Sequence, residues 1–328
     1  MRRGEDGVAG LSLVVFLLLP LGVAEWVVGE LAIYFSYALF AASLAFVWGQ
    51  GGLLCLGQAV FFGMGAYAMS LITLGMVPGL EGVVSTWVGV AAAVAVPALF
   101  ANLLGRFLFF SRGIQGAFFG IVTLAVAFII ERLAINWDYI GGLNGLMNVP
   151  PVNLGLNGDG AEVWEALPLY YLNLGVLAAG YLVLGGLVRS RWGVALRAIQ
   201  GHELRAQSLG YDVARYKVAA LTVGAAVAGL AGALFVSQFG FASPSLIGFG
   251  LSAEVLIWVA VGGRGALIAA CLGAILVRGL EAGLSSALGD WWLLVLGLMF
   301  IAVVMFLPRG VVGELVARLD RPRGTGRA

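Results

Sequence analysis

Long apolar runs recur along the whole of this 328-residue chain. Most of these runs approach the roughly 20 residues that a helix needs to cross the hydrocarbon of a bilayer, and the eighth, 251–262, is unusually short. Hydrophobic residues make up 61% of the chain and charged residues 11%, whereas a soluble domain carries about 25% charged residues. Since no stretch between the runs is long enough for a large soluble domain, we interpret residues 1–328 as one membrane domain, an all-α polytopic transmembrane helix bundle.

The apolar runs predict about ten spans, some of them short or broken at glycine-rich turns. Their expected ranges are 8–28, 31–48, 56–75, 86–104, 115–136, 168–188, 218–238, 251–262, 266–284 and 291–307. The first run follows Arg2 and Arg3 and resembles a signal peptide. Because it is long and has no convincing small-residue cleavage site, we expect it to stay as an uncleaved first helix.

The arginines predict the orientation, because loops rich in Lys and Arg stay in the cytoplasm. Cytoplasmic basic residues are expected at Arg106, Arg112, in the 189–217 loop and in the tail 309–328, which holds Arg309, Arg318, Arg321, Arg323 and Arg327. Acidic residues mark the opposite side, at Glu81, Asp138, Asp159, Glu162, Glu165 and Asp290. An even number of spans then places both termini in the cytoplasm. We expect the protein to lie in the inner membrane of the cell.

Several function classes fit the sequence poorly. The 18 basic and 17 acidic residues nearly balance, so charge indicates neither a nucleic acid nor an acidic partner. Cys55 and Cys271 lie in apolar segments far apart and are expected to be small buried residues rather than a disulfide or a metal site. The single lysine, Lys217, follows Tyr216, which excludes a Walker A motif. His202 has no second histidine with which to share a metal, so neither catalysis nor a cofactor is expected.

Ionisable residues inside the spans would indicate proton or sodium coupling within the chain. The candidates are Glu131, Arg132, Glu254 and Arg264. Arg264 stands in a glycine turn and the others lie near the ends of helices. We expect these four residues to lie at the membrane interfaces.

Glycine is abundant, with 50 residues, and much of it lies within the apolar runs. Small residues four apart let helices approach closely. Such pairs are Ala59 with Gly63, Ala225 with Gly229, Ala228 with Gly232, and Ala269 with Gly273. The denser clusters GQGGLLCLGQ (49–58) and VGGRGAL (261–267) predict helix breaks that flank a path, because irregular backbone at membrane depth must be satisfied by protein or water.

A polar stretch, residues 189–217, separates two apolar runs and carries eight formal charges. Burying them at a bilayer centre would cost on the order of 20 kcal/mol, so the stretch lies outside the membrane. Leu196, Ile199, Ala206 and Leu209 recur at helical spacing, and Gly210 stands where a helix cap would fall. The pattern predicts a short amphipathic helix that docks into a groove on a soluble partner; a solvated loop that only sets topology is the alternative.

Five stretches of the sequence resemble segments of one known family. They are SYALFAASLAFVWGQGGLLCLGQAVFFGMGAYAMSL, YIGGLNGL, LRAIQGHELRAQSLGYDVARYKVAALTVGAAVAGLAGALF, ASPSLIGFGLSAEVLIWVAVGGRGAL and FLPRGVVG. In this order, from about Tyr37 to Gly313, they resemble the permease subunits of ATP-binding-cassette (ABC) importers for branched-chain amino acids and for urea. The resemblance implies a permease core over residues 31–313. It also implies a heterodimer with a second homologous permease, two cytoplasmic ATPase subunits and an extracytoplasmic solute-binding protein.

In such importers a cytoplasmic coupling helix docks on the ATPase. The matching positions here are Arg197, Ile199, Gln200, His202, Glu203, Arg205, Ala206, Ser208 and Gly210. The stretch is only loosely similar to the E-A-A-x-x-x-G coupling motif, because Glu203 and Gly210 are one residue too far apart and Leu204 and Arg205 replace the alanines.

The translocation path and its substrate are less constrained. Residues expected to face the path are Gln58, Tyr67, Thr123 and Asn144, with Phe61 and Phe62 as gates. The stretch EVLIWVAVGGRG favours the urea members, whereas SPSLIGFG fits either branch. Two other functions stay open from the residues alone: a self-contained channel or ion-coupled carrier for a small polar solute, and a structural membrane scaffold without a water-accessible path.

Overall fold

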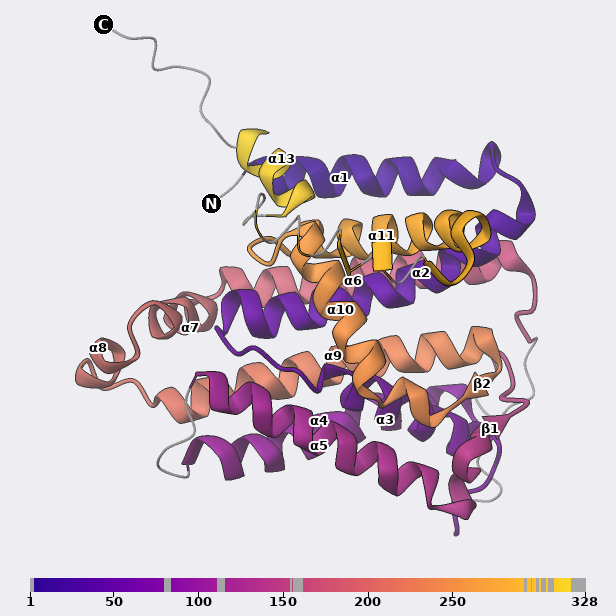
Figure 1. Ribbon diagram of the computed structural model, residues 1–328, viewed down its shortest axis with the longest axis horizontal. Coiled ribbons are helices and arrows are strands. Elements are labelled where there is room, and N and C mark those ends of the chain that lie inside the picture. Colours follow the sequence, from indigo (N-terminus) through magenta and orange to yellow (C-terminus); the bar gives the residue numbers. More distant parts are fainter. Residues whose placement is uncertain are drawn as a thin grey trace, which may run out of the picture.

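The computed structural model describes residues 3–79, 84–110, 116–153, 155, 162–291, 294–295, 297–298, 301, 305 and 310–319. These residues form a helix bundle, as predicted (Figure 1). In the described part of the chain the named strands are β1 (Leu146–Met147) and β2 (Phe241–Ala242), which pair antiparallel with Leu146 opposite Ala242. Glu81, Arg112, Asp159 and half of the predicted tail, residues 309 and 320–328, lie outside the described residues.

The helices follow one another with short connections. They are α1 (Arg3–Leu18), α2 (Glu25–Leu44), α3 (Gln58–Thr73), α4 (Thr86–Phe110), α5 (Ala117–Ile135), α6 (Ala166–Arg189), α7 (Arg191–Gly201), α8 (Glu203–Ser208), α9 (Val213–Phe239), α10 (Phe249–Gly262), α11 (Leu267–Leu288) and α13 (Val311–Leu319). Within the described residues, seven helical segments are long and apolar enough to cross a membrane, and α3 and α10 are shorter apolar helices. The second to ninth predicted spans each correspond to one of these helices, and the tenth falls largely outside the described residues.

The first predicted span has wrong bounds. The apolar run 8–28 belongs to two helices, because α1 ends at Leu18 and α2 begins at Glu25. Pro20 lies in the turn between them, has no N–H for continued α-helical bonding, and is followed by Gly22. Hydropathy alone does not register such a turn when the residues around it are apolar.

Helix α9 lies at the centre of the bundle and packs against α2, α3 and α4, while α2 also packs against α6 and α11. Small residues make this possible. A Cβ on Gly232 would collide with the carbonyl oxygen of Phe62 on α3, and a Cβ on Gly229 would collide with that of Ala93 on α4. Pro97 removes the N–H that would otherwise bond this Ala93 carbonyl within α4. The predicted role of small residues in close helix packing is confirmed.

The two ends of the bundle differ. Helices α7 and α8 project from one end, and the start of α1 and helix α13 lie at that same end (Figure 1). The strands β1 and β2 lie at the opposite end, and β1 belongs to the acidic connection 137–167. The segregation of basic and acidic connections predicted from the sequence thus corresponds to two ends of one bundle.

Candidate coupling helices and translocation path

The polar stretch folds into two short helices rather than the single predicted one. Ser190 caps α7 by accepting a hydrogen bond from the backbone N–H of Gly193 at 3.3 Å. His202 then adopts an extended backbone (φ −152°, ψ 92°) between α7 and α8. Gly210 takes a left-handed φ of 87°, which glycine tolerates best, and it ends α8 as the sequence predicted.

Helix α8 is held against the start of α9 by an apolar cluster and an ion pair. Ile199, Ala206 and Val213 are buried together, with Tyr216 packed against them. The Lys217 ammonium lies 2.7 Å from a carboxylate oxygen of Glu203, and the lysine side chain is only 11% exposed. Two of the chain's unusual polar residues therefore serve to fix α8 to the bundle.

The nine residues predicted to couple to an ATPase divide by exposure. Ile199 and Ala206 are buried, and Arg197 and Glu203 are half-buried. The Arg197 guanidinium donates to the carbonyl of Val188 at 3.2 Å, which leaves it less available to a partner. The exposed members of the set are Gln200, His202, Arg205, Ser208 and Gly210.

Two exposed apolar side chains were missed by the sequence reasoning. Leu204 is 78% exposed and Leu209 is 73% exposed. The predicted single helix placed Leu209 at helical spacing with Leu196, Ile199 and Ala206; those three are buried and Leu209 is not, because the break at His202 interrupts the helical spacing. Large apolar side chains in water are typical of interaction surfaces when they adjoin polar ones. We call the residues His202, Leu204, Arg205, Ser208 and Leu209 the tip surface.

The two predicted glycine breaks exist and touch each other. Helix α2 continues as a wider six-residue turn to Gln50, and the chain is not helical again until α3 begins at Gln58. The second break separates α10 from α11, and Gly263 there has a φ of 127°. A Cβ on Gly49 would collide with the carbonyl oxygen of Arg264, so only glycine lets the two breaks meet.

Helix α7 contacts the first of these breaks. The Gln200 amide nitrogen donates to the carbonyl oxygen of Gly49 at 3.1 Å. A Cβ on Gly52 would lie 2.8 Å from the Gln200 side chain, so the backbone approaches α7 closely there. Helix α7 is therefore in direct contact with the unwound segment between α2 and α3.

The predicted path residues fill the interior of the bundle in this conformation. Gln58, Phe61, Phe62, Tyr67 and Thr123 are buried, whereas Asn144 is exposed in the acidic connection. The Gln58 amide donates to the Ser43 hydroxyl at 3.1 Å, and the Thr123 hydroxyl accepts from the N–H of Leu56 at 3.1 Å. Their role in the path stays a prediction.

One of these residues leads to a charged cluster that the sequence reasoning missed. The Phe62 ring stacks on Tyr37, with centroids 6.3 Å apart, and Tyr37 packs against Trp258 at 5.1 Å. The guanidinium of Arg278 lies over the Tyr37 ring at 4.7 Å from its centroid. The aromatic side chains in the interior therefore contact a cation, Arg278.

Arg278 on α11 is surrounded by acidic groups. Its Nη1 lies 2.6 Å from a carboxylate oxygen of Glu281 and 3.7 Å from one of Glu254 on α10. A charge at the centre of a membrane helix costs about 2.5–3.5 kcal/mol on insertion scales, so such residues usually serve a function. The spacing of Arg278 and Glu281 within the apolar run 266–284 was the available signal, and only Glu254 had been considered.

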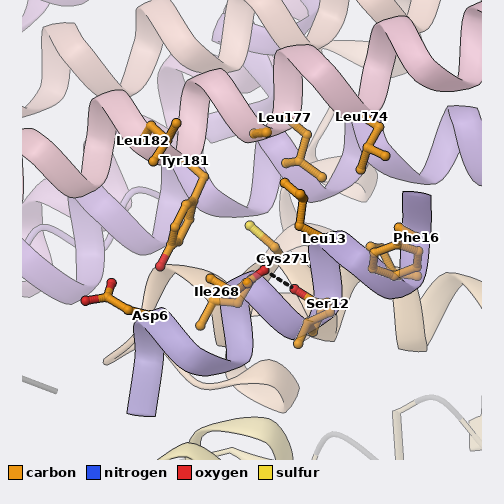
Figure 2. A pocket seen from close by; sticks show the side chains of 15 residues that line it. Asp6, Ser12, Leu13, Phe16, Leu174, Leu177, Tyr181, Leu182, Ile268 and Cys271 are labelled. Atoms are coloured by element: carbon orange, nitrogen blue, oxygen red, sulfur yellow. Dashed lines mark hydrogen bonds between the residues drawn. The ribbon is translucent and has the colours of Figure 1, made fainter. Parts of the chain in front are cut away.

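A separate cleft of about 330 Å³ lies between α1, α6 and α11 (Figure 2). Its lining is predominantly apolar and includes Leu13, Phe16, Leu174, Leu177, Tyr181 and Cys271. The Ser12 hydroxyl is satisfied locally by the carbonyl of Ala9 at 3.0 Å. This lining suits hydrocarbon rather than a small polar solute, so we do not place the translocation path there.

The chain is similar to known transport proteins over most of its length. Residues 27–304 match a protein family described as branched-chain amino acid transport system / permease component. The high-affinity branched-chain amino acid transport system permease protein LivM of Escherichia coli (strain K12) is 29% identical over 97% of this chain and 78% of its own length. The corresponding LivM protein of Salmonella typhimurium is also 29% identical, over 92% of this chain and 73% of its own. The BraD permease of Pseudomonas aeruginosa is 26% identical over 88% of this chain and 95% of its own. No solved structure matches the chain.

Proposed function

This chain belongs to the family of permease components of branched-chain amino acid transport systems, and from that premise we propose how it takes part in transport. It is the membrane permease subunit of an ABC importer, and its relatives are transport permeases rather than enzymes. We propose that it forms half of the translocation pathway in the inner membrane, with both termini in the cytoplasm.

The proposed assembly contains a second homologous permease, two cytoplasmic ATPases and an extracytoplasmic solute-binding protein. The tip surface is the proposed ATPase contact, because it projects from the bundle and combines Leu204 and Leu209 with exposed polar residues. Amphipathic helices dock in this way into grooves on soluble partners. The chain contains a single lysine, which does not stand in a Walker A motif, so the energy must come from a separate subunit.

Coupling is proposed to run from the tip surface to the glycine breaks. Helix α8 is tied to α9 by Glu203 and Lys217, and α7 is tied to the first break by Gln200 and Gly49. Because Gly49 also touches Arg264, movement of α7 and α8 would reach α10 and α11. This shared contact would let ATP binding outside the membrane rearrange helices within it.

The proposed substrates are branched-chain amino acids. The single observation that carries this choice is the family match over residues 27–304, supported by relatives whose names specify branched-chain amino acid transport. The urea alternative, which the stretch EVLIWVAVGGRG favoured, finds no support among these relatives.

Reconstitution tests the proposal. The chain, its cognate permease, the ATPases and the binding protein are placed in vesicles, and uptake of labelled leucine and labelled urea is measured with and without ATP. We expect ATP-dependent leucine uptake and none of urea. Vesicles without the ATPases serve as the control and should take up neither solute. Transport by the chain alone would instead establish a self-contained channel or carrier.

A further inference from the structure

The Arg278 cluster lies halfway along the helices that carry it. Arg278 is the twelfth of the 22 residues of α11, and Tyr37 is the thirteenth residue of the 26-residue span that runs from Glu25 to Gln50. Glu254 lies on the neighbouring short helix α10. The charges therefore lie far from both membrane interfaces, so their side chains cannot extend to the water at either surface.

The contacts within the cluster do not use all of its hydrogen-bonding groups. Arg278 uses the same nitrogen, Nη1, for Glu281 and Glu254. Among the described residues, Nη2 makes no hydrogen bond, and the Arg278 side chain is 22% exposed. The Glu254 side chain is 35% exposed, and at 3.7 Å it lies beyond hydrogen-bonding distance of Arg278. Arg278 can therefore donate a further hydrogen bond, and the neighbouring Glu254 carboxylate can accept one.

We propose that Arg278 and Glu254 form a transit site for a zwitterionic α-amino acid within the membrane. The free Nη2 of Arg278 binds the substrate carboxylate, and the Glu254 carboxylate binds the ammonium group. In an α-amino acid the carboxylate and the ammonium group are attached to the same carbon. A cation and an anion that lie close together on adjacent helices, Arg278 and Glu254, can therefore bind both groups at once. This inference rests on the proposed function and deepens it by naming the groups that accept the substrate.

The surroundings hold Arg278 in place for this task. Glu281, three residues further along α11, fixes Nη1 at 2.6 Å. The rings of Tyr37 and Trp258 lie 4.7 Å and 5.8 Å from the guanidinium and support it through cation–π contact. Both aromatic side chains are themselves buried. A positioned arginine recognises a carboxylate better than a mobile one, because less conformational freedom is lost on binding.

Neutral urea would not require this arrangement. Urea carries no ammonium group for Glu254 and no carboxylate for Arg278, so two opposite charges at membrane depth would serve no purpose in its passage. A second reading is that the cluster only joins α10 to α11 or contacts the neighbouring permease. The experiment below separates these readings.

The first variant is Glu254→Gln, which keeps the side-chain size and removes the charge. In the complete importer reconstituted in vesicles, we expect ATP-dependent leucine uptake to fall about 10-fold or more, because the substrate ammonium exchanges a charged acceptor for a neutral one. Co-purification of the neighbouring permease should stay at the wild-type level. The control is Arg132→Gln, which removes an exposed charge from α5 and should leave uptake unchanged.

The second variant replaces the cluster by apolar residues: Arg278→Met with Glu254→Leu and Glu281→Leu. A purely structural cluster tolerates such replacement, because apolar side chains of similar volume can pack as well as an ion pair. Wild-type uptake by this triple variant or by Glu254→Gln would overturn the proposal. Loss of the neighbouring permease from purified Glu254→Gln would also overturn it, in favour of a subunit contact.

The two proposals fail in different ways. If the wild-type importer takes up no leucine, the proposed function fails. If it does and Glu254→Gln transports equally well, only the transit site fails.

Discussion

Two ion pairs in this protein have similar geometry in different surroundings. At the end of the bundle, Lys217 lies 2.7 Å from Glu203 and 5.7 Å from the centroid of the Phe109 ring. Halfway along α11, Arg278 lies 2.6 Å from Glu281 and 4.7 Å from the centroid of the Tyr37 ring. Each pair combines a cation, a carboxylate and an aromatic face.

The two pairs differ in what would surround the carboxylates if the cation were removed. Glu203 has a 31% exposed side chain on a helix that projects from the bundle, so water can solvate it when the lysine is absent. Arg278 faces two carboxylates halfway along a membrane helix, where hydrocarbon cannot solvate a charge as bulk water does, even though Glu254 is about as exposed as Glu203. The first pair therefore needs only a structural explanation, whereas the cost of the second requires a functional one.

Removing the membrane cation should have the largest effect. Arg278→Ala leaves Glu254 and Glu281 without their cation, and we expect a loss on the order of 3–5 kcal/mol in folding free energy. Thermal unfolding of the detergent-purified protein measures it, with Arg132→Ala as the exposed control. Adding Glu254→Gln and Glu281→Gln to the alanine variant should recover part of the loss. Unfolding temperatures equal to wild type would show that the two ion pairs do not differ as argued.

Removing the lysine should have a smaller effect that depends on salt. Lys217→Met keeps the apolar stem and leaves a Glu203 that water can reach, so we expect a loss on the order of 1 kcal/mol. A double-mutant cycle with Glu203→Gln isolates the pair. Its coupling energy should fall as the ionic strength rises, because the partly exposed Glu203 is in contact with the salt solution. A matched cycle on Arg278 and Glu281 should respond much less, and equal salt sensitivity would contradict the comparison.

Changing the tip surface should have the smallest effect on stability. Leu204→Ser combined with Leu209→Ser removes two exposed side chains, so we expect a change within about 0.5 kcal/mol in folding free energy. Association with the ATPase subunits should nevertheless weaken, because the apolar part of the contact is lost. Co-purification of the ATPases measures this, and Gln207→Ala, also exposed on α8, is the control. Unchanged association would place the coupling contact elsewhere.

The helix bundle could be predicted from the sequence because each span is decided locally, by its own length and hydropathy. The glycine clusters also predicted their breaks, since glycine permits the positive φ seen at Gly263. The single helix predicted for the polar stretch is wrong, because one extended residue, His202, divides it into α7 and α8. Arg278 was missed because two charges, Arg278 and Glu281, lower the mean hydropathy of a 22-residue helix only slightly.

By itself, the sequence determined that this protein crosses a membrane many times, that a charged segment stands outside it, and that small residues let its helices pack closely. Only the tertiary structure decided that Gly49 meets Arg264, that Glu203 pairs with Lys217 and that Glu254 faces Arg278. The physical reason is that insertion depends on the residues of one segment, whereas contacts between distant segments depend on how each helix is rotated and placed against its neighbours.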